Sequence, residues 1–324
     1  MNHDPSIRRL SYLALAIAYV QIVFGAIVRI SNSGLGCGDH WPKCAGYWFP
    51  PLDRTDLLIE LTHRYLALLV TVAIIALLVS AWRRRGEPVA NRVLRPAAVA
   101  AGLVVTAAIF GAITVKMTLE PIVIVVHLAI AMTLLATLAL ATVRAGGLGA
   151  SRVAAAPTAK SFRGARVAAG MAFVILVLGA LTANLPGANV ACMGFPLCNE
   201  LMAKGGMGHL QLTHRVLAYL LALHVIGLAI GVAKRRERGA VLAASRVALA
   251  AVVVQIAIAA AMVLGHLPPA LRSAHQAAGA LVWLSLFTLA ALARLSAVRE
   301  FTGATTSEVS VPFLRPSGPK GARS

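Results

Sequence analysis

Four histidines occur in two pairs with nearly equal spacing. His127 follows His63 by 64 residues, and His275 follows His214 by 61. All four lie within long apolar stretches, where an ionisable side chain is costly and therefore points to a function. Two imidazoles that face each other across a helical bundle suit the two axial positions of a haem iron. The spacing therefore predicts one haem site in each half of the chain.

Two other interpretations of these histidines stay open. In the first, each imidazole is satisfied separately by a backbone carbonyl of a neighbouring helix, as a buried polar group requires. In the second, each pair holds a bare transition metal, although no carboxylate or thiolate accompanies either pair at the same depth. The recurrence of the pairs at matching positions favours haem.

The sequence around the first histidine of each pair is repeated. Leu-Thr-His-Arg at 61–64 recurs at 212–215, and Gly-Ala at 25–26 recurs at 179–180. Each Leu-Thr-His-Arg copy follows a loop that contains two cysteines. The chain is therefore expected to consist of two related halves.

Glu60 breaks this internal symmetry, because its counterpart in the second half is Gln211. Glu60 lies three residues before His63, so the two side chains share a helix face. A partly buried carboxylate beside a haem edge takes up and releases protons, which an amide does not. The sequence therefore predicts a reactive haem in the first half and a supporting haem in the second. A favourable interaction of Glu60 with the positive end of its helix is the alternative.

Three arginines, Arg29, Arg64 and Arg215, lie near the same depth as the histidines. Arginine binds carboxylates in a bidentate manner, so these three are candidates for binding haem propionates. Extension of the side chains to the membrane interface is the alternative interpretation.

All four cysteines lie in loops on one side of the apolar stretches, at spacings of seven and six residues. Outside the cytoplasm the environment is oxidising, so we expect two disulfides, Cys37–Cys44 and Cys192–Cys198. Either both bonds only staple their loops, or Cys37 and Cys44 exchange electrons or a covalent bond during turnover.

The composition predicts an all-α integral membrane protein. The chain of 324 residues is 59% hydrophobic and 13% charged, whereas soluble domains carry about 25% charged residues. Alternation typical of a β-barrel is absent from the sequence. Eight runs are long enough to cross a bilayer as helices, at roughly 10–30, 58–82, 96–115, 122–143, 167–186, 209–233, 247–265 and 272–295.

The net charge of +19 is explained by the orientation of these spans. With the N-terminus inside, 22 of the 30 Lys and Arg residues fall on the inner side and 5 in the outer loops. This distribution follows the positive-inside rule, so it argues against nucleic-acid binding. We expect a multi-pass protein of the cell (inner) membrane, with both termini cytoplasmic and the haem sites near the outer face.

Each half has an even number of spans, so both halves must point the same way through the membrane. The sequence therefore predicts two tandem four-helix bundles related by a pseudo-two-fold axis along the membrane normal. The expected parts are an N-terminal bundle with the substrate haem site (1–143), a cytoplasmic linker (144–166), a C-terminal bundle with the haem b site (167–296) and a disordered cytoplasmic tail (297–324).

Taken in order, these motifs resemble those of the haem A synthase family over roughly residues 10–295. The resemblance is carried by Glu60-x-x-His63-Arg64, the first cysteine pair, His127, His214-Arg215 and His275. It implies an oxidoreductase that converts haem O to haem A for terminal oxidases by oxidising a ring methyl group to a formyl group.

The resemblance also implies roles for individual residues. His63 and His127 would flank the substrate haem, while His214 and His275 would hold a permanent haem b. Glu60 would be a catalytic proton-transfer or substrate-orienting group. Cys37 and Cys44 would act as a catalytic redox pair, with the second cysteine pair structural.

The implied partners are haem O, the haem O synthase, an electron partner of unknown identity and the lipid bilayer, and homo-oligomer formation is kept as an alternative to a monomer. Two other functions are also kept. One is a di-haem b-type membrane cytochrome that transfers electrons from quinol, and the other is a haem carrier without chemistry.

Overall fold

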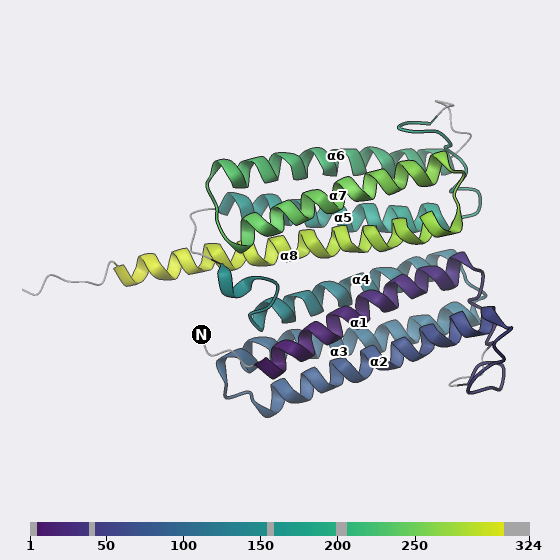
Figure 1. Cartoon of the computed structure of the whole chain (residues 1–324), viewed down its shortest axis with the longest axis horizontal. Coiled ribbons are helices and arrows are strands. Elements are labelled where there is room, and N and C mark those ends of the chain that lie inside the picture. Colours follow the sequence, from purple (N-terminus) through teal and green to yellow (C-terminus); the bar gives the residue numbers. More distant parts are fainter. Residues whose placement is uncertain (1–4, 39–42, 154–158, 199–205, 308–324) are drawn as a thin grey trace, which may run out of the picture.

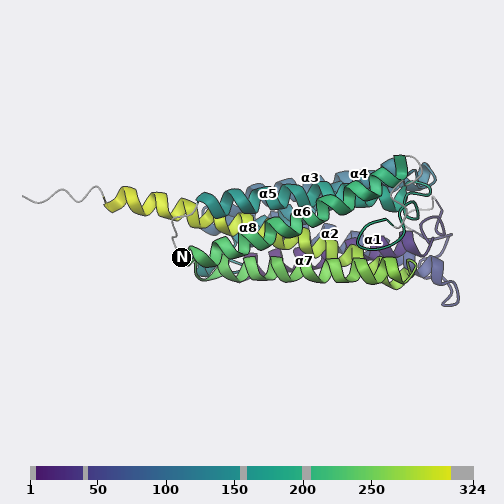
Figure 2. The ribbon, with the colours of Figure 1, turned by 90° about the horizontal axis from the view of Figure 1, so that it is seen from above.

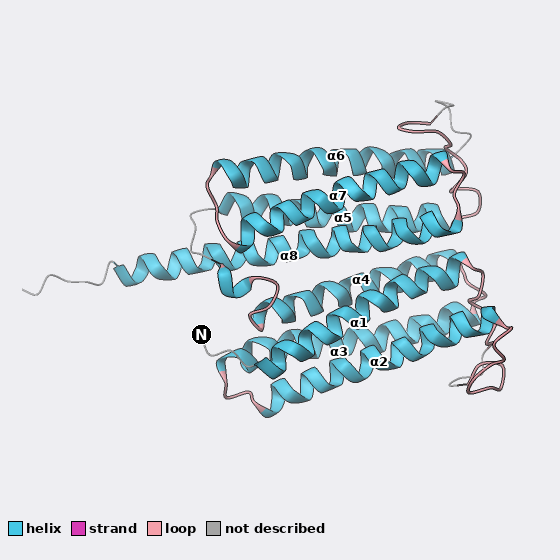
Figure 3. Cartoon of the chain, viewed as in Figure 1, coloured by secondary structure: helices cyan, strands magenta, loops and turns pink. Residues whose placement is uncertain are grey.

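The computed structural model describes residues 5–38, 43–153, 159–198 and 206–307. Within these residues the protein is built from helices and contains no strand (Figure 3). Eight of the described helices are long and apolar enough to cross a membrane, which confirms the predicted all-α membrane protein. They are α1 (Pro5–Ile30), α2 (Thr55–Arg83), α3 (Pro88–Lys116), α4 (Pro121–Arg144), α5 (Ala159–Asn184), α6 (Gly206–Lys234), α7 (Ala240–Leu264) and α8 (Pro269–Ser307).

The helices form two bundles that lie side by side (Figure 1). In the first, α1, α2, α3 and α4 contact one another in a closed ring, and α5, α6, α7 and α8 do the same in the second. Seen from above, the helices of both bundles run along the same long axis (Figure 2). In each ring the second and fourth helices therefore face each other across the bundle. The pseudo-two-fold axis between the bundles stays a prediction.

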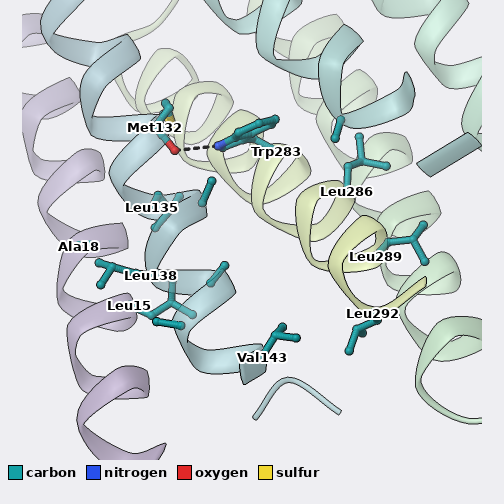
Figure 4. Close-up of a cluster of buried hydrophobic side chains, with 14 of the residues drawn as sticks. Leu15, Ala18, Met132, Leu135, Leu138, Val143, Trp283, Leu286, Leu289 and Leu292 are labelled. Carbon is teal, nitrogen blue, oxygen red and sulfur yellow. Dashed lines mark hydrogen bonds between the residues drawn. The ribbon is translucent and has the colours of Figure 1, made fainter. Parts of the chain in front are cut away.

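The two bundles pack together mainly through α8, which contacts α1 and α4 as well as its own ring neighbours. The indole N–H of Trp283 in α8 donates to the carbonyl of Met132 in α4 at 2.9 Å (Figure 4). Leu135 and Leu138 of α4 and Leu286 of α8 are fully buried in the same core. Burial of these side chains stabilises the interface by roughly 2 kcal/mol each.

Helix α3 begins eight residues earlier than the sequence predicts, at Pro88 rather than near 96. Proline at the first helical position is favourable, but Pro96 lies inside the helix and has no N–H for the carbonyl of Arg92. The guanidinium of Arg144, in the last turn of α4, donates to that carbonyl instead, at 3.2 Å. A tertiary contact thus replaces the missing helical bond.

Two further boundaries differ from the expectation. Helix α5 begins at Ala159, so only part of the predicted linker 144–166 lies outside the long helices, and it contains a 3-10 turn at Ala150–Arg152. Helix α8 continues to Ser307, beyond the predicted end of the second bundle at 296, and disorder of the tail stays a prediction. Extending an existing helix adds a hydrogen bond for each residue fixed, which explains both extensions. The rest of the predicted tail, 308–324, lies outside the described residues.

Candidate functional site

The structure brings the histidines together in the pairs that the spacing suggested. His63 on α2 lies within electrostatic range of His127 on α4, across the first ring. His275 on α8 lies within the same range of His214 on α6, across the second ring. Each pair is thus contributed by helices on opposite sides of a bundle. Their role as haem ligands stays a prediction.

Glycines on the neighbouring helices make room for three of these imidazoles. A Cβ added at Gly179 of α5 would lie 2.8 Å from Cε1 of His214, and one at Gly25 of α1 would lie 3.1 Å from Cε1 of His63. At Gly111 of α3 the distance to Cε1 of His127 would be 3.4 Å. The repeat of Gly-Ala was visible in the sequence, but the close approach of each imidazole to the glycine was not.

The histidines of the second bundle line a cavity of about 240 Å³. Most of its wall is aliphatic, from α5, α6, α7 and α8, and its described lining contains no acidic residue. Three arginines line it as well, namely Arg29, Arg215 and Arg272. An apolar cavity with two imidazoles and several cations suits a flat, mainly apolar ligand that carries carboxylates.

The orientation of His214 fits a metal ligand. Its Nδ1 lies 3.0 Å from the carbonyl oxygen of Ile175, and a carbonyl only accepts, so Nδ1 carries the hydrogen. This bond leaves a lone pair on Nε2, which is the usual arrangement of a metal-binding histidine. The residues of the second bundle therefore suit a haem.

The first bundle leaves its histidines with unmet hydrogen-bonding capacity. Nδ1 of His63 and Nδ1 of His127 are buried and have no partner among the described residues. Nε2 of Gln21, on α1, lies 3.4 Å from Nε2 of His63. Buried polar atoms without partners are rare in folded proteins, so these rings suit a bound group that the chain itself does not supply.

Sequence reasoning missed the glutamines beside the histidines. Gln21 contacts His63, and Nε2 of Gln255 on α7 lies 3.2 Å from Nδ1 of His275. When the two halves are aligned on Gly25 and Gly179, the residue equivalent to Gln21 is Ile175. The glutamine is therefore not repeated, and nothing in the sequence indicated its contact. Only the packing of α1 on α2 and of α7 on α8 shows these contacts.

Glu60 is bound to the cysteine loop of the first half. Its carboxylate, 4% exposed, accepts the backbone N–H of Cys37 at 2.8 Å and a guanidinium N–H of Arg64 at 2.7 Å. Arg64 also donates to the carbonyl oxygens of Gly38 and Lys43. One charged pair thus connects the start of α2 to the loop above it.

The second half lacks this charged pair. Arg215 donates to the carbonyl oxygens of Gly194 and Cys192, at 2.7 and 2.6 Å. Gln211 donates weakly to Asn189 at 3.4 Å, and its buried Oε1 has no partner among the described residues. In this structure, Arg64 and Arg215 bind backbone carbonyl groups of the cysteine loops, and their role in binding propionates stays a prediction.

Both expected disulfides are present. Cys37 is bonded to Cys44, and Cys192 to Cys198. The Sγ atoms of the first pair lie 3.9 and 3.7 Å from the carbonyl oxygen of Leu57, one turn before Glu60. The first disulfide therefore lies directly against the start of α2.

The chain matches the family model of the cytochrome oxidase assembly proteins, COX15-CtaA, over residues 8–58 and 54–287. The chain belongs to this family. The matched region of this family member runs from α1 into α8, and it contains both histidine pairs and both disulfides.

Two relatives are similar to this family member over most of their length, and a third matches it over about a third of its own length. The chain is 31% identical to a Heme A synthase of Symbiobacterium thermophilum, over 81% of this chain and 87% of that protein. A Heme A synthase of Shouchella clausii is 28% identical, over 80% of this chain and 87% of that protein. A Protoheme IX farnesyltransferase of Thermus thermophilus is 32% identical over 63% of this chain, which covers 34% of that protein.

Proposed function

We propose that this family member is a haem A synthase, a membrane oxidoreductase that converts haem O to haem A. The observation that carries the proposal is the pairing of histidines across both bundles, with an acid beside only one pair. The similarity to proteins named Heme A synthase supports the same activity. An electron-transfer cytochrome would have no need for the difference between Glu60 and Gln211.

The first bundle is the proposed substrate site. His63 and His127 flank haem O, and the glycines beside them keep both rings in place. Oxidation of a methyl group to a formyl group takes up one oxygen atom and releases protons together with electrons. Glu60 is the buried carboxylate at this end of the described bundle, so we assign it the transfer of these protons.

Cys37 and Cys44 belong to the same proposed site. The N–H of Cys37 donates to Glu60, so the loop and the carboxylate are in direct contact. We assign the first disulfide a catalytic redox role and the second disulfide a structural role. The electron partner of this step stays unassigned.

The second bundle is the proposed site of a resident haem b. His214 and His275 hold its iron, and when bound it supplies one-electron transfer. Arg29 and Arg272 are close enough to repel each other, and both line the cavity. The carboxylates of a bound haem would offset this repulsion, so we assign these two arginines, together with Arg215, to binding the propionates.

The proposed setting is the cell membrane, with both termini cytoplasmic and both haem sites near the outer face. The match to a Protoheme IX farnesyltransferase supports a connection to the enzyme that makes haem O, which we propose as a partner.

Identification of the bound haems tests the proposal. The full chain is purified from cells that also make haem O, and the extracted pigments are identified by mass. We expect haem b together with haem O or haem A, and haem b alone would contradict the proposal. His214→Ala should remove the b-type absorbance, whereas His224→Ala, on the same helix but bonded to Gly164, should retain it.

A further inference from the structure

An open pocket of about 400 Å³ lies at the end of the first bundle opposite the histidines. Its lining residues belong to the start of α1 and to the segment that follows α4. Figure 1 shows that these two parts of the chain lie at the same end of the first bundle. Its lining consists of Arg8, Tyr12, Gly146, Gly147, Gly149, Ser151 and Arg152. No role in haem binding falls to these residues, because the whole length of the bundle separates them from the imidazoles.

The pocket presents two positive charges and no negative one. Its described lining includes Arg8 and Arg152 but no acidic residue. Neither guanidinium has a protein partner in the described part of the chain, and Arg8 is half-buried. Other arginines at this end are engaged, as when Arg235 donates to Glu237 at 3.1 Å. A half-buried cation without a counter-charge is costly, so the pocket is suited to an anion.

The wall of the pocket is held in position by Tyr12. The phenol oxygen of Tyr12 accepts the backbone N–H of Leu148 at 2.5 Å, which leaves its own O–H free to donate. A Cβ at Gly147 would lie 2.9 Å from Cε2 of Tyr12 and 2.7 Å from Cγ2 of Thr142. Glycine at 147 is therefore required for the turn to approach α1 so closely.

The second bundle fixes the other side of the same turn. A Cβ at Gly239 would lie 2.6 Å from the carbonyl oxygen of Arg152, and one at Gly149 would lie 3.1 Å from Cβ of Ala240. The backbone at Arg152 thus packs against the start of α7. Because both bundles hold the pocket, its two arginines are presented on a preorganised frame, which lowers the entropy cost of binding.

We propose that this pocket binds a phosphate group. Two guanidinium groups, a phenol and a serine hydroxyl are donors that match phosphate oxygens, and arginine is the preferred residue for this purpose. The pocket lies at the end that the Lys and Arg distribution assigns to the cytoplasm, where basic pockets beside membrane helices bind anionic lipid headgroups. The phosphate belongs either to such a headgroup or to a free phosphate ion.

Binding is tested with the haem-loaded full chain in neutral detergent. The probes are short-chain phosphatidylglycerol, short-chain phosphatidylcholine and inorganic phosphate, and bound molecules are counted by native mass spectrometry. The pocket variant is Arg8→Gln with Arg152→Gln. The matched control is Arg9→Gln with Arg163→Gln, two exposed arginines that do not line the pocket but remove the same charge.

We expect the pocket variant to bind phosphatidylglycerol at least about tenfold more weakly, while the control binds as the unaltered protein does. Displacement of the lipid by inorganic phosphate identifies the phosphate group alone as the ligand, and retention of the lipid identifies the whole headgroup. Tyr12→Phe should weaken binding by a smaller factor. Equal losses in the pocket variant and the control would overturn the proposal, as would no binding by the unaltered protein.

The haem content of each variant shows whether it has folded. Should the double variant lose haem, Arg152→Gln alone replaces it, because this exposed side chain has no described protein contact to lose. Unchanged phosphatidylglycerol binding in that variant would then count against the pocket.

Discussion

Arg29 belongs to the first bundle, but it donates a hydrogen bond to the carbonyl oxygen of Ala183 in the second, at 3.1 Å. Its guanidinium also lines the cavity that contains His214 and His275. The first half of the chain thus contributes a cation to the candidate haem site of the other half. This contact connects α1 of the first bundle directly to the candidate site of the second bundle.

Replacement of Arg29 should therefore affect the second site. Arg29→Gln removes a charge-assisted contact with a propionate, and we expect haem b to bind about tenfold more weakly. Haem b per protein is measured after extraction. Lys116→Gln serves as the control, because Lys116 is an exposed cation on α3 at the same end of the first bundle as Arg29. Loss of the substrate haem with full retention of haem b would place Arg29 in the first site instead.

Replacement of Glu60 by the residue found in the second half should abolish the reaction. Glu60→Gln keeps an acceptor for the N–H of Cys37 but loses the charge pair with Arg64 and the titratable proton. We expect haem A formation to fall by at least about a hundredfold. Haem b content should stay unchanged. Glu120→Gln, an exposed acid before α4, should leave activity intact, and normal activity of Glu60→Gln would exclude its assigned role.

The close contact between Gly179 and the His214 ring allows a test of the ring position that changes no polar group. Gly179→Ala places a Cβ 2.8 Å from the ring, so the imidazole must shift. We expect a clear loss of haem b absorbance. Gly170→Ala on the same helix is the control, because its added Cβ meets no atom within 4 Å. Equal haem content in the two variants would show that the ring position is not critical.

The two disulfides should respond differently to removal. The double substitution Cys37→Ser and Cys44→Ser removes the disulfide that holds the loop against Glu60. We therefore expect strongly reduced haem A formation. Serine at both Cys192 and Cys198 should reduce thermal stability but leave more activity. Haem A per protein is measured for both at a temperature where each is folded. Equal activities would favour a purely structural role for both bonds.

The contact of Arg144 with the carbonyl of Arg92 should matter only while Pro96 is present. Arg144→Met leaves that carbonyl without its donor, and we expect a loss of about 1 kcal/mol in the free energy of unfolding. In the Pro96→Ala background the helix supplies its own N–H, so the same replacement should cost much less. Denaturation of the unaltered protein, the two single variants and the double variant gives the coupling free energy between the two positions. Additive losses in the free energy of unfolding would show that Arg144 does not compensate for Pro96.

The sequence was sufficient to predict the eight helices and the pairing of the histidines. Each long apolar run must satisfy its own backbone in the bilayer, and this local requirement leads to a helix. The second and fourth spans run in the same direction, so His63 and His127, each near the start of its span, lie at the same end. The helix ends were less accurate, because α3 begins at Pro88 and continues through Pro96, where Arg144 compensates for the missing N–H.

The sequence by itself thus determined the all-helical fold, the two disulfides and the placement of four histidines within the apolar helices. These follow from apolar length, redox environment and repeated motifs, all of which are properties of short segments. Only the tertiary structure decided that Arg29 reaches the second bundle, that Arg64 and Arg215 hold the cysteine loops, and that Gln21 lies beside His63. Such contacts depend on how helices pack at distances of a few ångströms, and spacing along the chain does not encode that packing directly.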